Sequence, residues 1–213
     1  VLTLGSNAVG QSLTVTGTLT ASAQSTINIG GSVSSTSTMS LDAITLTADT
    51  TLTSTSDAIS ASTIDGAYDL TIASGAAQSL TSAIGSSTAL TSINVSTTSG
   101  NLTLGNNITV TGTGTDAMIF NAGSSTDAGT TTGGNIIISG SPTFTTGSGG
   151  RMTYYTGSVS GSTGLTSLIG SGSNRFRYNS DETTTNYSAA LSSGKYAIYR
   201  EQPTLTITAD DET

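Results

Sequence analysis

Aliphatic residues recur at every second position in short runs along the first 150 residues, and this alternation constrains the fold more than any other feature. Successive side chains of a strand point to opposite faces, so Leu102-Thr103-Leu104 presents two apolar groups on one side and a hydroxyl on the other. Gly, Ser, Asn and Asp, which favour turns, separate these runs. Equivalent triplets lie at residues 2–4, 13–15, 27–29, 39–41, 44–46, 70–72, 93–95 and 108–110. The sequence therefore predicts a folded all-β chain with strands of about three to five residues.

The composition excludes several classes of function. The chain has no Cys and no His, which rules out zinc fingers, thiol proteases and Ser-His-Asp triads. A net charge of −8 and a pI near 4.1 argue against nucleic acid as a partner. No apolar run approaches the length of a membrane helix, so we expect no membrane insertion. We also expect no catalytic, cofactor-binding or metal-ligating residues and no cofactor.

Charge and aromatic residues divide the chain into two zones. Residues 1–150 contain seven Asp but no Lys, Arg or Glu, and only three of the ten aromatic residues. The boundary falls at the glycine cluster 147–150. We interpret residues 1–150 as shaft repeats, 151–202 as C-terminal coils with a capping segment, and 203–213 as a linker or the first strand of a following module.

Internal similarity favours a solenoid. The segment LTLGSNAVGQSLTVTGT, from Leu2, shares its pattern with LTLGNNITVTGTG, from Leu102. A β-sandwich would also have short strands at regular spacing, but these strands are very short, their inward residues are almost all aliphatic, and the pattern persists for most of the chain. A right-handed parallel β-helix with about 20 residues per coil would place about seven coils in the first zone.

The C-terminal zone carries a family resemblance. The stretch FRYNSDETTTNYSAAL, from Phe176, followed by YAIYREQP, from Tyr196, resembles the segment that closes the β-helix in filamentous-haemagglutinin-like exoproteins of Gram-negative bacteria. The resemblance implies secretion through an outer-membrane pore and display at the cell surface. It also implies that Thr204 to Ala209 begin an MBG-type β-sandwich module. The absence of a starting Met and of a signal peptide fits an excised fragment.

The aromatic residues of this zone suggest an end cap independently of the resemblance. Their hydroxyls can stay in water while their rings cover the last coil. The expected cap residues are Tyr154, Tyr155, Phe176, Tyr178, Tyr187, Tyr196 and Tyr199. Arg175 and Arg177 flank Phe176, so one face of this strand would be aromatic and the other basic. Asp181 and Glu182 are close enough in sequence to pair with these arginines.

An acidic series is the first candidate site to be weighed. Polysaccharide-cleaving β-helices use clustered carboxylates, and the spacing of this series could bring some members onto adjacent coils. No Lys, Arg or His lies nearby to assist, so we interpret the residues as turn formers. The series is Asp42, Asp49, Asp57, Asp65 and Asp69.

Three further patterns have ordinary explanations. Thr-x-Thr triplets resemble ice-binding ladders, but they do not recur once per coil; they begin at Thr14, Thr45, Thr51 and Thr109. Asn-x-Ser/Thr triplets arise by chance in so Ser- and Thr-rich a chain; they begin at Asn94, Asn101, Asn107 and Asn186. Tyr154 and Tyr155 could stack on a carbohydrate, although capping is the favoured role, and the glycines at 147–150 lack the Lys of a phosphate loop.

The function expected from the sequence is structural and adhesive: a stalk that presents neighbouring binding domains, not an enzyme. Partners would be host or matrix glycans or proteins, bound through those domains, and strand edges could associate end to end. The alternatives are a polysaccharide-degrading β-helix enzyme and a solenoid that binds glycan or ice.

Overall fold

The computed structural model describes residues 2–4, 12–22 and 26–204. The regular structure in these ranges is almost all β-strand, with one five-residue helix, α1 (Leu165–Ile169). The strand pairings found there are all parallel. The all-β prediction is confirmed, and the parallel pairing is compatible with a solenoid.

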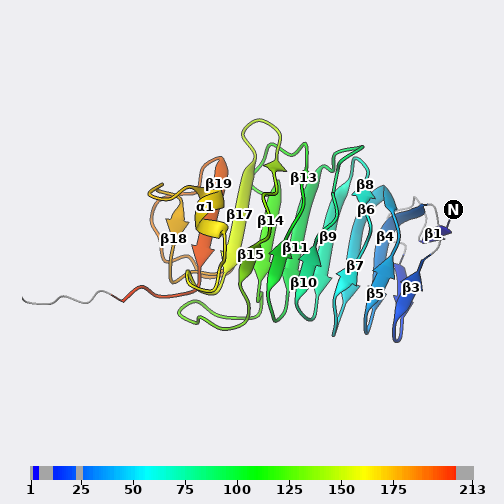
Figure 1. Cartoon of the computed structure of the whole chain (residues 1–213), viewed down its shortest axis with the longest axis horizontal. Coiled ribbons are helices and arrows are strands. Elements are labelled where there is room, and N and C mark those ends of the chain that lie inside the picture. The colour runs from blue at the N-terminus through cyan, green and yellow to red at the C-terminus, as the bar shows by residue number, and fades with distance from the viewer. Residues whose placement is uncertain (1, 5–11, 23–25, 205–213) are drawn as a thin grey trace, which may run out of the picture.

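The chain passes three strand-bearing faces in turn, and each face stacks strands from successive coils (Figure 1). Face A contains β2 (Ser12–Val15), the second halves of β4 (Ile27–Ser35) and β6 (Ile44–Ser54), β9 (Asp69–Ser74), β11 (Ser92–Thr97), β14 (Met118–Ala122), β17 (Arg151–Thr156), β19 (Gly194–Tyr199) and β18 (Phe176–Arg177). Face B contains β3 (Leu19–Ala21), β5 (Met39–Leu41), β7 (Ile59–Ser60), β10 (Gln78–Leu80), β12 (Leu102–Leu104) and β15 (Ile136–Ile138). Face C contains β1 (Leu2–Leu4), the first halves of β4 and β6, β8 (Ile64–Asp65), β13 (Ile108–Thr109) and β16 (Phe144–Thr145).

Coil length increases along the chain. On face A, Leu52 is in register with Ile72, about 20 residues further on. Phe120 is in register with Tyr154, and Tyr154 with Ala197, so the last coils are about twice as long. The extra residues lie in the connections between strands. The ladder of hydrogen bonds on face A therefore stays continuous although the connections become longer along the chain.

Two strands are much longer than the sequence predicts. The strand β4 has nine residues and β6 has eleven, because each continues around the corner from face C to face A. The pairing of β4 with β6 shifts register between Ile29 and Gly31, and Gly31 has a φ of 88°. Only glycine adopts this conformation without strain, so this residue lets the strand bend without ending.

Inward side chains form columns along the stack. The longest column on face A changes from aliphatic to aromatic towards the C-terminus: it consists of Leu13, Val33, Leu52, Ile72, Val95, Phe120, Tyr154, Ala197 and Phe176. Each fully buried aliphatic side chain stabilises the fold by about 1.5–3 kcal/mol. Burial of an aliphatic side chain at the same inward position of each coil can thus stabilise the fold without disulfides.

A second column on face A carries buried hydroxyls. Ser35, Ser54, Ser74 and Thr97 occupy equivalent positions at the ends of successive strands. Each hydroxyl donates to a backbone carbonyl of a neighbouring turn, as Ser54 Oγ does to Ser37 O at 2.7 Å and Thr97 Oγ1 to Gly100 O at 2.9 Å. These bonds satisfy turn carbonyls that the strand ladder leaves unpaired.

The last strands do not follow chain order. β19 pairs with β17 on one side and with β18 on the other, so β18 is outermost although it precedes β19 in sequence. The helix α1 contacts β15 and β19, and its Leu165 and Ile169 are buried (Figure 1). Face A runs without interruption across the compositional boundary at residue 150. Nearly all of the segment expected to begin a following module, from Thr204 on, lies outside the described residues.

Candidate functional site

The acidic series does not form a single cluster. Asp49 and Asp69 are neighbours on adjacent coils at the start of face A, since the Asp69 amide donates to Asp49 Oδ1 at 3.1 Å. Asp65 lies at the end of β8 on face C, and Asp57 follows β6 at the opposite end of face A. The structure therefore brings Asp49 and Asp69 together and separates Asp57 and Asp65 from them.

These carboxylates hold turns of neighbouring coils. Asp65 Oδ1 accepts from the amides of Ser87 and Thr88, at 2.7 and 3.1 Å. The Ser37 hydroxyl donates to Asp57 Oδ2 at 2.8 Å, and the Ser92 hydroxyl donates to Asp69 Oδ1 at 2.7 Å. Within the described ranges, no three acidic side chains come close enough to hold a metal ion. These three carboxylates therefore make turn contacts.

Three of the Asn-x-Ser/Thr asparagines have structural partners: Asn186 Nδ2 donates to the Asn179 carbonyl, and Asn101 and Asn107 accept from backbone amides. Asn101 Oδ1 accepts from the Asn135 amide at 2.9 Å, and Asn135 Oδ1 accepts from the Ser158 amide at 2.8 Å. Asn107 Oδ1 likewise accepts from the Thr143 amide at 2.8 Å. The sequence analysis missed this asparagine ladder. The Gly-Asn dipeptides that precede residues 102–104 and 136–138 are the signal that could have revealed it.

The threonine triplets lie on two different faces. Thr14, Thr51 and Thr53 are on face A, whereas Thr45 and Thr109 are on face C. They therefore do not build the single continuous ladder that an ice-binding face needs.

The structure divides the expected cap residues into three groups, and Tyr155, which is half-buried near Tyr187, belongs to the second. Tyr154 belongs to the interior column: it is fully buried, stacks on Phe120 with 5.2 Å between ring centroids, and lies 6.2 Å from Phe144. Burial raises the pKa of its hydroxyl. Because both its faces meet neighbouring coils, Tyr154 is neither a cap residue nor a free carbohydrate platform.

A second group lies on the outer side of face A. The guanidinium of Arg175 lies 5.0 Å from the ring centroid of Tyr196, and Arg177 lies 5.3 Å from Tyr187 and 5.6 Å from Tyr196. The Tyr196 ring is buried, and its hydroxyl meets that of Ser192 at 2.8 Å. This hydrogen bond and the nearby arginines lower the pKa of Tyr196. These cation–π contacts hold the segment before β19 against the sheet.

The expected pairing of Arg175 and Arg177 with carboxylates is not found in the described part of the chain. Arg177 donates to the carbonyls of Asn174 and Phe176, at 3.4 and 2.9 Å. Asp181 accepts instead from the amides of Thr183 and Ala128, at 2.7 and 2.8 Å. Burial acts to raise the pKa of Asp181, but these hydrogen bonds, with those of Thr184, outweigh it and hold the pKa below its usual value.

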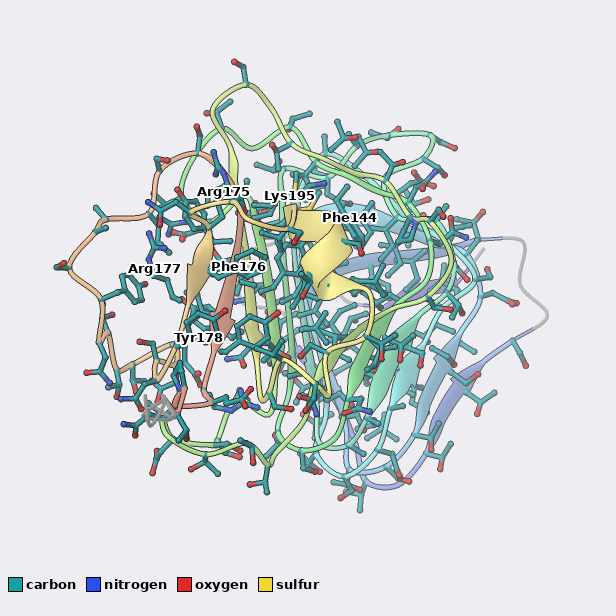
Figure 2. The ribbon with its side chains drawn as sticks, turned by 60° about the vertical axis from the view of Figure 1, so that its left-hand side comes forward. Phe144, Arg175, Phe176, Arg177, Tyr178 and Lys195 are labelled. Atoms are coloured by element: carbon teal, nitrogen blue, oxygen red, sulfur yellow. The ribbon has the colours of Figure 1, made fainter. Side chains whose placement is uncertain are left out.

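The third group surrounds an open cavity beside β18. Phe176 points towards the interior and Arg177 towards the outer segment, as alternation predicts (Figure 2). Tyr199 stacks on Tyr178, with 5.4 Å between centroids and 14° between planes, and on Phe176, at 6.3 Å and 24°. The cavity has a volume of about 350 Å³. It is lined by Val159, Thr166, Ser171, Gly172, Ser173, Phe176, Tyr178 and Tyr199.

Comparisons with known proteins add no family: a scan against family models, a search of curated proteins and a search of solved structures each returned no match. Among the described residues, no helix is long and apolar enough to span a membrane.

Proposed function

We propose that the chain is a structural segment of a secreted, cell-surface exoprotein of the filamentous-haemagglutinin-like type. It acts as a right-handed β-helical stalk that holds neighbouring binding domains away from the cell. The observation that carries the proposal is the continuous parallel ladder of face A, from β2 to β18. A ladder of this kind holds its two ends a fixed distance apart along one axis, and this role requires no reactive side chains.

The outer surface of the first coils supports this role. Outward positions of face A carry Ser32, Thr51, Thr71 and Asn94 in register, and they are exposed or half-buried. These side chains keep a strand soluble but offer no strong acid, base or nucleophile. Right-handed winding is proposed because parallel crossover connections are right-handed in nearly all known cases.

The two ends support a directional stalk. In the interior, Leu13 and Leu19 of the first coils are half-buried, whereas Val33 and Met39 on the next coil are buried. At the other end, we propose that α1, which contacts β15 and β19, and the segment before β19 act as the cap of the stack. A half-buried aliphatic surface favours stacking of a further coil or of a second copy.

Two measurements test the proposal. Antibodies raised against the purified segment should label intact cells of the source organism, and small-angle scattering should give an elongated particle. Labelling that appears only after the cells are permeabilised would contradict surface display, and a near-spherical scattering envelope would contradict the stalk. Sedimentation at increasing concentration will show whether the half-buried end drives association, which should weaken in a Leu13→Ser, Leu19→Ser variant.

A further inference from the structure

The cavity beside β18 has features of a ligand site that the stalk proposal does not use. Val159 and Tyr178 on its rim are 42% and 37% exposed, although most large apolar side chains of the described chain are buried. Its volume of about 350 Å³ lies at the lower end of the range for small-molecule pockets. The site is therefore open, partly apolar, and sized for one small ring rather than for a polymer chain.

Two hydroxyls in the lining lack a partner of good hydrogen-bond geometry. The Tyr199 side chain is fully buried, and within the described part of the chain neither its hydroxyl nor the buried hydroxyl of Ser173 makes a well-formed hydrogen bond, although the Thr166 hydroxyl is close enough to Tyr199 for a weak one. Burial raises the pKa of Tyr199, while the nearby Thr166 hydroxyl acts in the opposite direction. Buried hydroxyls without partners are costly and uncommon, so their place in a cavity wall points to a ligand that forms hydrogen bonds.

The charges around the cavity select a neutral ligand. No charged side chain lines it. The nearest carboxylate, Glu201, is close enough to raise the pKa of Tyr199 further, and it accepts from the Val159 amide on the rim at 2.7 Å. The guanidinium of Arg177 lies over Tyr187 and Tyr196, on the other side of the sheet. An anionic ligand would thus meet a carboxylate and no cation.

We propose that this cavity binds a single neutral pyranose sugar, held against the accessible rings of Tyr178 and Phe176 and hydrogen-bonded by Tyr199 and Ser173. A pyranose presents C–H groups on one side and hydroxyls around its edge, which match a ring face and unpartnered hydroxyls. A ligand of this size with a small contact area should bind with a Kd of about 1 mM. The proposal does not depend on the stalk function, because it concerns only this end of the chain.

The test is a nuclear magnetic resonance titration of the ¹⁵N-labelled chain. The probes are the methyl glycosides of glucose, galactose, mannose and N-acetylglucosamine, with glucuronic acid as the charged counterpart. At least one neutral glycoside should give saturable chemical-shift changes at the amides of Thr166, Ser171, Ser173 and Tyr178. Glucuronic acid should bind with an affinity at least tenfold lower. Absence of saturable shifts up to about 50 mM, or equal binding of glucuronic acid, would overturn the proposal.

Matched variants locate the site. Tyr178→Ala should weaken binding about tenfold or more, Ser173→Ala several-fold, and Tyr178→Phe little, since it keeps the ring. Tyr68→Ala is the control, because Tyr68 is also 37% exposed but does not line the cavity. All three positions are at least partly accessible, so the four variants should fold, which the amide spectrum will verify. Equal affinities of Tyr178→Ala and Tyr68→Ala would place any binding elsewhere and refute the site.

Discussion

The coils up to β11 and those from β14 onward share one hydrogen-bond ladder but differ in length and in the side chains that they bury. In the first region, coils have about 20 residues and the inner column is aliphatic, as at Leu52 and Ile72. In the second region, the coils are longer and the same column holds Phe120 and Tyr154. The comparison teaches that the backbone ladder sets the register, whereas connection length sets how much side-chain volume each coil can bury.

The outer face differs in the same way. Asn94 is exposed on β11, but Tyr196 and Ile198 on β19 are buried beneath the segment that precedes them. The second region also contains Arg200, which is fully buried and donates to the carbonyls of Thr132 and Gly134, at 3.3 and 2.8 Å. Burial lowers the pKa of Arg200. The longer connections thus supply carbonyls to Nη2 of Arg200, whereas its Nε and Nη1 have no hydrogen-bond partner in the described part of the chain.

The largest expected effect compares the two interiors directly. Phe120→Ala should lower the free energy of unfolding by about 3–5 kcal/mol, because Phe120 is fully buried and contacts two other rings. Leu52→Ala is the aliphatic counterpart and should cost somewhat less. Both losses of unfolding free energy can be measured by denaturant unfolding monitored through amide hydrogen exchange. Residue-level exchange is needed because repeat proteins can open locally. A smaller loss for Phe120 would mean that the aromatic column is loosely packed.

The next effect concerns the junction between the two three-stranded sheets of face B, β3-β5-β7 and β10-β12-β15, which lies within the first region. Here the Gln78 side chain replaces strand pairing: its Oε1 accepts from the Ile59 amide at 2.8 Å, and its Nε2 donates to the Ile59 carbonyl. Gln78→Leu should cost about 2 kcal/mol, because both groups of Ile59 lose their partner. Exchange of the Ile59 amide should accelerate, whereas Gln202→Leu, at an exposed position, should change nothing. An unchanged exchange rate of the Ile59 amide would show that these two sheets are coupled by packing alone.

An effect of similar size tests the hydroxyl column across both regions. Thr156 occupies the position equivalent to Ser54, but its hydroxyl accepts from the buried Ile136 amide at 2.9 Å instead of serving only a turn carbonyl. Thr156→Val should cost about 2 kcal/mol, since an N–H is left unpaired, and Ser54→Ala about 1 kcal/mol. Thermal and denaturant unfolding provide the comparison. Equal losses would indicate that both hydroxyls play the same role.

The smallest effect is the pH dependence of the second region. Because the folded-state pKa of Asp181 is lowered, its contribution to stability is present above the unfolded value of about 3.9 and is lost as the pH falls through the folded value. The difference in unfolding free energy between the wild type and Asp181→Asn should therefore shrink below about pH 4. A difference that stays constant from pH 7 to pH 3 would contradict this. Asp42→Asn, on the first region, provides a comparison.

The sequence predicted elements better than sites. Period-two alternation identified the inward residues at 27–29, 70–72 and 102–104 because each strand contacts only its nearest neighbours, which makes the pattern local. It misjudged the length of β4 and β6, since a strand that bends around a corner keeps the same alternation on both sides of the bend. The cap residues were grouped by composition, which cannot distinguish the interior Tyr154 from the rim residue Tyr178.

By itself, the sequence determined that this chain folds as β-strands with aliphatic side chains inside and hydroxyls outside, since that information is carried by neighbours two residues apart. Only the tertiary structure decided which coils pair, that β19 inserts between β17 and β18, and that Tyr178, Tyr199 and Ser173 share one cavity. The physical reason is that strand register and cavity shape depend on how the connections between strands fold back onto the stack. The contacts that result join residues far apart in the chain, so a local pattern does not contain them.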